Sequence, residues 1–375
     1  MLDTILDPAN PVPWVIIAGL LAGAIAVIYR PFSTYIKFVY PNAKYEAIGN
    51  PYITERELNK LIENKNINGF KEMLNTNKDY QLTGENIYDL QKALDDHLIK
   101  TIEQMKKDNS RKMKYFYDTY IEKIDLYLIK HIVKNRLRDI NVDKKIIENA
   151  LLKKTKNVLQ DLIDADKNSI PEILKNYGLP DEIREVLKDE KDIDFLKLDT
   201  LFDIYIINKF KQTSVPYKCE DGRNKFINYL VDTLNVKNVL RAKQLGYNIE
   251  NCKKLFLGEG QEIALWKFNE LSEADSVSQM ISSLQGTSYY EPLKNSIEDY
   301  NRENSVQVLE NALDRNFLNI VRDISMQNYI TIGPTIRFLV SKEFEIRNLK
   351  TIVKGIGENM PPDFIKNVLV TGGET

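Results

Sequence analysis

The segment EIRNLKTIVKG, residues 345–355, is typical of an amphipathic helix, and the chain contains it three times in related forms. The other copies are DTLNVKNVLRAK at 232–243 and DLYLIKHIVKN at 125–135. Aligned on their first acidic residues, the copies start 107 and 113 residues apart. A helix repeated at this spacing predicts the organisation of the whole chain.

Equivalent positions in the three copies carry side chains of the same kind. Four, seven and eight residues after the acid the side chains are apolar, a spacing that lines one face of a helix: Ile129, Val236 and Leu349; Ile132, Val239 and Ile352; Val133, Leu240 and Val353. Five and nine residues after it they are cations on one polar face: Lys130, Lys237 and Lys350; Lys134, Arg241 and Lys354. A period of about 110 residues is far longer than a solenoid unit, so we expect three similar helical lobes. Chance similarity between unrelated amphipathic helices is the alternative.

A second helix is expected after each copy. PPDFIKNVL, residues 361–369, is the clearest, because two prolines suit the first turn of a helix. The corresponding stretches are residues 141–152 and 248–257.

The composition favours a folded body without nucleic acid as a partner. The 375 residues include 52 basic and 54 acidic side chains, so the net charge of −2 offers no excess for phosphate binding. Hydrophobic residues make up 43%, as in globular proteins. Cys219 and Cys252 are too few and too distant for a disulfide framework, which favours reduced thiols in a cytoplasmic compartment.

An uncharged segment near the N-terminus predicts a membrane helix. VPWVIIAGLLAGAIAVIY, Val12 to Tyr29, has 18 residues, just enough to cross a hydrocarbon core of about 30 Å. Trp14 and Tyr29 bracket it as interfacial aromatic residues do, and Gly19 and Gly23 permit close helix approach.

The charges beside this segment set its predicted orientation. A cleaved signal peptide, the alternative, would need positive charge before the apolar run. Here Asp3 and Asp7 precede it, and Arg30, Lys37 and Lys44 follow. The positive-inside bias therefore predicts a retained anchor in the cell membrane, with the N-terminus outside and the body in the cytoplasm.

From residue 52 onward the helical period dominates, beginning with Thr54 and Glu57 in capping-box spacing. The predicted fold class is all-α, with three similar helical lobes around a pseudo-threefold axis preceded by one N-terminal transmembrane helix. The predicted divisions are an anchor (1–30), an interfacial linker with three prolines (31–51), and lobes at 52–160, 161–270 and 271–375.

The sequence predicts no catalytic, cofactor-binding or metal-binding residue. It has no phosphate loop of the form G-x-x-x-x-G-K-[ST], and the glycine pairs at 258–260 and 355–357 are expected to end helices. His97 and His131 lack neighbouring ligand residues, which favours structural or surface roles. The adjacent acids Asp95 and Asp96 diverge on a helix and are expected at the solvated surface.

Three lobes that each contain a D/E-x-x-N-x-x-x-x-x-[RK] helix resemble the C-type subunits of the archaeal and bacterial A/V-type ATP synthases. That family is similar to the d-type subunits of eukaryotic V-type ATPases. The matching pieces are Asn235 with Arg241, Ala242 and Lys243, and Asn348 with Lys354 and Gly355 before Pro361 and Pro362. The resemblance covers roughly residues 52–375. Leu128 stands at the asparagine position of the first copy, and the apolar N-terminal segment departs from the soluble pattern usual in the family.

The resemblance implies a non-catalytic central-stalk subunit, present once per complex. A three-lobed funnel would cap the membrane proteolipid ring and receive the foot of the rotor shaft, formed by the D and F subunits, so that ion flow drives ATP synthesis or the reverse. Such a coupler needs stiff helices and a broad socket but no cofactor. The alternative is an unrelated membrane-anchored helical adaptor that recruits a cytoplasmic partner. An enzyme is disfavoured, because no nucleophile–base or metal grouping is present.

Overall fold

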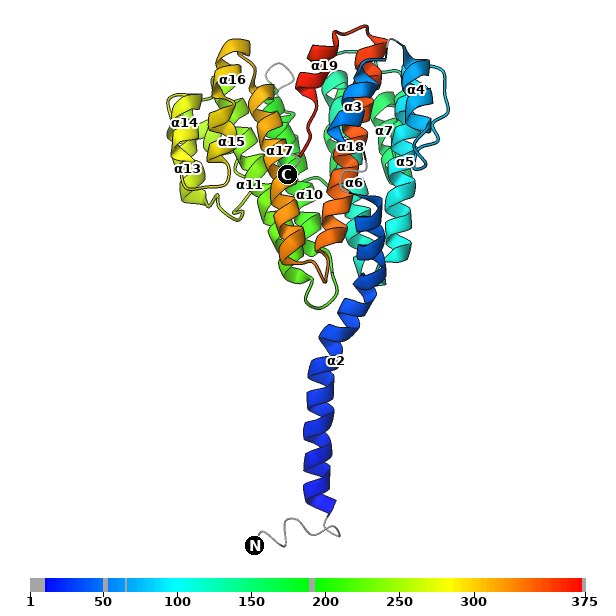
Figure 1. The fold of residues 1–375 in the computed structure, drawn as a ribbon. Helices are drawn as coiled ribbons and strands as arrows, with labels where there is room; N and C mark the ends of the chain where they lie inside the picture. Colours follow the sequence, from blue (N-terminus) through cyan, green and yellow to red (C-terminus); the bar gives the residue numbers. More distant parts are fainter. Residues whose placement is uncertain (1–10, 50–52, 65, 189–192, 373–375) are drawn as a thin grey trace.

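The computed structural model describes residues 11–49, 53–64, 66–188 and 193–372 (Figure 1). Within these ranges the chain is helical and contains no strand, which confirms the all-α fold class and the long apolar helix near the N-terminus. Residues 1–10, which include Asp3 and Asp7 of the predicted anchor, lie outside the described residues, as does Pro51.

Six long helices form the frame of the body: α5 (Ile87–Asp108), α6 (Lys114–Leu137), α10 (Phe195–Gln212), α11 (Glu220–Gln244), α17 (Val306–Gln327) and α18 (Gly333–Gly357). Shorter helices cover them: α3 (Glu55–Ile62), α4 (Ile67–Asn75), α7 (Lys153–Asp164), α8 (Ile170–Tyr177), α9 (Ile183–Val186), α12 (Ile249–Lys253), α13 (Leu265–Glu273), α14 (Val277–Ser283), α15 (Tyr290–Asn295), α16 (Ile297–Glu303) and α19 (Pro362–Val368). Three 3-10 turns complete the list: η1 (Arg111–Met113), η2 (Lys144–Asn149) and η3 (Lys167–Ser169).

The long helices form three hairpins, α5–α6, α10–α11 and α17–α18. Their turns lie at the end of the body from which the N-terminal helix α2 (Pro11–Ile48) emerges (Figure 1). Each hairpin packs on the next, because α6 contacts α10, α11 contacts α17, and α18 returns to α5. The apolar columns of the three repeated segments supply this packing, and Ile129, Val236 and Leu349 are fully buried. The hairpins therefore contact one another in a closed cycle.

The repeated segments lie where the sequence predicts helices, in α6, α11 and α18. The predicted capping box also forms, since the Thr54 side chain accepts from the Glu57 amide and Glu57 accepts from the Thr54 amide. The expected second helices appear as α12 and α19, but residues 144–149 form only the 3-10 turn η2. Just after that turn the amides of Leu151 and Leu152 donate to the Asp125 carboxylate, so a side chain ends the turn.

The sequence predicts a linker over residues 31–51, whereas α2 runs without interruption from Pro11 to Ile48. Pro31 and Pro41 lie inside this helix, where each removes one backbone hydrogen bond, and α2 is bent between its free and body-bound parts (Figure 1). Beyond the bend one face packs on the body, burying Thr34, Phe38, Pro41, Asn42 and Tyr45. This packing compensates for the two prolines.

The joint between α2 and the body is specific and polar. The buried Asn42 amide nitrogen donates to the carbonyls of Tyr329 and Thr331, 2.9 Å away in each case. Tyr45 stacks on Phe338 with ring centroids 4.7 Å apart. The helix therefore enters the body in one fixed register.

Asn42→Ala is expected to lower the free energy of unfolding of the full chain by about 1–3 kcal/mol, because the buried Thr331 carbonyl and the partly buried Tyr329 carbonyl lose their donor. Chemical unfolding in detergent measures this, and hydrogen exchange at residues 328–333 should rise. Lys37→Ala, at an exposed position of the same helix, is the control and should change stability by less than about 0.5 kcal/mol. Equal effects from both variants would show that the Asn42 contacts do not hold the joint.

Candidate functional site

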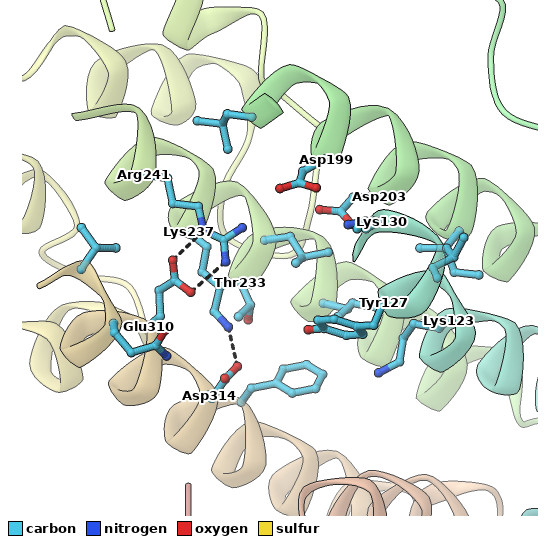
Figure 2. Close-up of a pocket in the computed structure, with 18 of the residues that line it drawn as sticks. Lys123, Tyr127, Lys130, Asp199, Asp203, Thr233, Lys237, Arg241, Glu310 and Asp314 are labelled. Carbon is cyan, nitrogen blue, oxygen red and sulfur yellow. Dashed lines mark hydrogen bonds and ion pairs between the residues drawn. The ribbon is translucent and has the colours of Figure 1, made fainter. Parts of the chain in front are cut away.

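A cavity of about 840 Å³ lies between α6, α10, α11, α17 and α18 (Figure 2). Aromatic side chains from three of these helices, Tyr120, Phe226 and Phe317, line part of it and are themselves buried in contact with one another. Tyr127 and Leu245 also line it and are exposed, at 66% and 64% of their surface. We call this cavity the socket. Part of its lining is buried and aromatic, and part, including Tyr127 and Leu245, is exposed.

The cation columns of the first two repeats face this socket, and each cation is bound by an acid of the next hairpin (Figure 2). On α6, Lys130 and Lys134 pair with Asp203 and Asp199 of α10 at 2.5 and 2.6 Å. On α11, Lys237 pairs with Asp314 of α17 at 2.5 Å. Arg241 of the same helix makes a bidentate ion pair with Glu310 at 2.6 and 2.8 Å. The repeated cations therefore join neighbouring hairpins.

In the third copy one cation also pairs with an acid of a neighbouring hairpin, but outside the socket. Lys350 of α18 pairs with Asp95 of α5 at 2.7 Å. Asp95 is 7% exposed, so the expectation that it lies at the solvated surface is wrong. Lys354 departs from the pattern, since it is exposed and lies 3.9 Å from Glu358, the residue that follows the end of its own helix.

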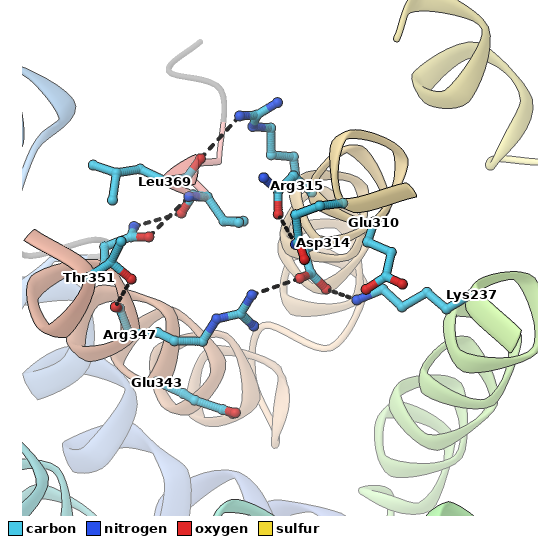
Figure 3. Close-up of polar contacts among 12 residues, drawn as sticks. Lys237, Glu310, Asp314, Arg315, Glu343, Arg347, Thr351 and Leu369 are labelled. Carbon is cyan, nitrogen blue, oxygen red and sulfur yellow. Dashed lines mark hydrogen bonds and ion pairs between the residues drawn. The ribbon is translucent and has the colours of Figure 1, made fainter. Parts of the chain in front are cut away.

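Asp314 of the socket wall binds cations from two other helices (Figure 3). One carboxylate oxygen accepts from Lys237 of α11, and the other accepts from Arg347 of α18 at 3.0 Å. Burial opposes ionisation of Asp314, but the two cations outweigh it and lower the pKa of the carboxyl. A single charged group on α17 therefore ties α11 to α18.

The acid that opens each repeat binds backbone amides of a segment that crosses its helix. Asp125 accepts from Leu151 and Leu152, whereas the equivalent Glu345 accepts from Ile53. Asp232 accepts from three amides in the loop after α12: Gln261, Glu262 and Ile263. Burial still raises the pKa of the Asp232 carboxyl to about 6.

The two glycine pairs, at 258–260 and 355–357, have different structural roles. As predicted, α18 ends at Gly357. Gly260, however, does not end a helix: it lies in the loop over Asp232, where a Cβ would stand 1.8 Å from the carboxylate oxygen Oδ1. Glycine is therefore required there for close approach.

The repeated asparagine holds a second crossing segment. Asn348 donates to the Val370 carbonyl at 2.7 Å and accepts from its amide at 3.0 Å. Asn235 makes the same two contacts, to the Gly258 carbonyl and the Leu257 amide, both at 3.0 Å. Leu128 of the first copy has no group for this role, which explains why that copy departs from the pattern. The two asparagines thus each hold a crossing segment against their helix, and we call each such pair of hydrogen bonds a clasp.

The charged side chains that line the socket are bound in ion pairs. Across the part of the chain that the structure describes, no group of three or more His, Cys, Asp or Glu side chains could hold a metal ion. His97 packs on Tyr80 and lies 3.4 Å from Asp79, while His131 is exposed at the socket. Burial raises the pKa of Cys219 to about 12, so its thiol is not activated.

Sequence reasoning missed the acids of the socket wall. The signal was present as two acid pairs four residues apart in otherwise apolar helices, LKLDTLFD at 196–203 and LENALD at 309–314. Their spacing matches that of the cation pairs, five and nine residues after each opening acid. Nothing local, however, shows which helix each pair faces.

Taken together, the fold and the socket define a helical structural subunit that carries one helix of membrane-spanning length. The chain belongs to the ATP synthase (C/AC39) subunit family, whose model matches residues 41–368. It is therefore a subunit of the A-type ATP synthase, which confirms the resemblance found in the sequence and rules out an unrelated adaptor.

Several relatives described as the C-type subunit of A-type ATP synthase match nearly the whole chain. The protein of Methanobrevibacter smithii is 27% identical over 95% of this chain and 94% of the relative. The protein of Pyrococcus horikoshii is 26% identical over 98% of both, and that of Methanosphaera stadtmanae 25% over 95% and 94%. The match to the Pyrococcus protein covers 98% of this chain and therefore includes the apolar N-terminal segment. That segment has a counterpart in this relative.

Asp314→Asn is expected to lower the free energy of unfolding by about 3 kcal/mol, because Lys237 is left buried without a full charge opposite. The loss should be complete at pH 7. It should shrink as the pH falls below about 4, where the carboxyl of the unfolded chain takes up a proton, and be smallest below the lowered pKa of the folded carboxyl. Asp164→Asn removes an exposed pair with Lys144 and is the matched control, expected to leave the unfolding curve almost unchanged. Similar losses in both variants would contradict the role of Asp314.

Asn348→Leu places in the third copy the residue type that occurs in the first. It should cost about 1–3 kcal/mol, because the buried amide and carbonyl of Val370 both lose their partner. Asn367→Leu, an exposed position on α19, is the control with the same change of chemistry. Thermal unfolding of the purified chain measures both, and an unchanged midpoint for Asn348→Leu would refute the clasp.

Proposed function

We propose that this chain is the non-catalytic central-stalk subunit that couples the rotor shaft, formed by the D and F subunits, to the membrane proteolipid ring. The observation that carries the proposal is the socket, an open cavity whose wall charges are bound by neighbouring helices and so are not available for chemistry. Nucleotide hydrolysis then belongs to other subunits, since the sequence has no phosphate loop.

The size of the socket limits what can enter it. A helix with its side chains is 10–12 Å across, so about 840 Å³ accommodates roughly 9 Å of one helix, or about six residues. The socket therefore receives the tip of a shaft rather than a length of coiled coil. Its exposed lining, which includes Tyr127 and Leu245, suits an apolar tip.

The lobe divisions at 52–160, 161–270 and 271–375 are part of this proposal. The repeated acids and the first cation of each copy support them, because each acid accepts from a backbone amide and each of these cations pairs with an acid of a neighbouring hairpin. Three similar units around an axis would distribute torque over the whole ring of helices.

The proposal places α2 across the membrane, with the N-terminus outside and one copy of the body in the cytoplasm. None of the apolar window of α2 is buried against the body, which leaves it available to lipid. Arg30, Lys37 and Lys44 follow the apolar run, which supports this orientation by the positive-inside bias.

Leu234→Arg tests the socket, because Leu234 is half-buried on α11 and lines the cavity. Purification of the complex through a tagged proteolipid should then recover at least tenfold less shaft and head. Tyr127→Ala, at an exposed socket position, should weaken recovery without disturbing folding. Trp266→Arg is the control, since Trp266 is equally exposed but does not line the socket. Full recovery of shaft and head with both socket variants would overturn the coupling role.

A further inference from the structure

Two cations flank one tyrosine ring where the apolar part of α2 ends. The Arg30 guanidinium lies 4.5 Å from the ring centroid of Tyr217, in the loop between α10 and α11. The Lys218 ammonium lies 5.7 Å from the same centroid. The two positive charges are therefore held within about 10 Å of each other, where they repel unless an anion lies between them.

Neither cation makes an ion pair with a carboxylate anywhere in the described residues, in contrast to the cations of the socket. The nearest acid along the chain, Glu220, is exposed in the first turn of α11, where it faces the helix dipole. Two cations therefore lie beside one ring without a carboxylate of the described residues bound to either of them, whereas the socket cations are paired.

The loop holds Lys218 in a costly conformation. Its φ of 69° lies in the left-handed region, which costs a non-glycine residue roughly 1–2 kcal/mol. Hydrogen bonds on both sides fix the loop, from the Cys219 amide to the Pro216 carbonyl and from Arg223 to the Thr213 carbonyl. The fold therefore fixes the backbone from which the exposed Lys218 side chain extends.

Beyond Arg30, α2 has an uncovered apolar face. Its side chains are 57–64% exposed and recur at helical spacing opposite the face that packs on the body: Phe32, Ile36, Val39 and Tyr40. Lys37 is exposed beside them. An apolar stripe edged by cations and aromatic rings is typical of helices that lie in the headgroup layer of a membrane.

We propose that Arg30, Tyr217 and Lys218 bind the phosphate of an anionic phospholipid, with the exposed stripe that begins at Phe32 beside it at the membrane surface. Arg30 directly follows the apolar run, which places it at headgroup level when α2 spans the membrane, the one element of the proposed function used here. The charge complementarity favours a lipid phosphate over an apolar protein surface. The turn between α10 and α11 is then a lipid-binding tip of the body.

The test uses the full chain in a neutral detergent, titrated with short-chain phosphatidylglycerol, with phosphatidylcholine of the same chain length, and with inorganic phosphate. Native mass spectrometry or calorimetry gives the dissociation constants. Phosphatidylglycerol should bind, and Arg30→Gln with Lys218→Gln should weaken it at least tenfold, because each cation near an anionic surface is worth about fivefold. Lys153→Gln with Lys156→Gln, on α7 at the opposite end of the body, is the charge-matched control and should change nothing (Figure 1).

Three results would overturn the proposal. Equal binding of the two lipids would show that the headgroup charge is not recognised. Binding of inorganic phosphate as tight as that of phosphatidylglycerol would assign the site to the free anion. Unchanged lipid binding in the double variant, together with loss of the proteolipid ring on purification, would make this face a protein contact. Each is separable from failure of the coupling role, which is measured by recovery of shaft and head with an intact socket.

Discussion

A buried ammonium group must have a carboxylate opposite it, and this constraint fixes the arrangement of the long helices. Breaking such a pair leaves an uncompensated charge in a medium that solvates it poorly. Lys237 and Asp314 are each less than 10% exposed, so their helices cannot slide past one another by one turn without separating them. The apolar columns bring the hairpins together, and the ion pairs select one register among those that apolar packing would tolerate.

Local sequence patterns predicted what depends on neighbours along the chain. The capping box at Thr54, the helices α6, α11 and α18, and the end of α18 at Gly357 all follow from residues within one or two turns. What the patterns could not supply is the partner of each cation. Lys130 finds Asp203 at a separation of 73 residues, and Lys350 finds Asp95 at 255. Such pairings depend on how the chain closes, which spacing alone does not encode.

The segment after the apolar run shows a second limit of sequence reasoning. Two internal prolines and a following glycine argue for a break, and in an isolated peptide they would weaken the helix. In the fold, Asn42 and Tyr45 gain buried partners only if the helix continues, so tertiary contacts offset the lost backbone hydrogen bonds. The first copy of the repeat differs from the other two because Leu128 cannot form the side-chain hydrogen bonds that Asn235 and Asn348 make to their crossing segments.

The unbroken path of α2 has a mechanical consequence. Its 38 residues, about 57 Å of helix, have no flexible joint between the apolar end and the body. A bent rigid rod fixed to a turning body can spin in place only if its outer arm coincides with the rotation axis. Otherwise that arm sweeps a cone through its surroundings and meets viscous drag at every revolution. In the proposed rotor, the direction of the bend between the free and body-bound parts of α2 therefore determines how far the outer arm lies from the rotation axis.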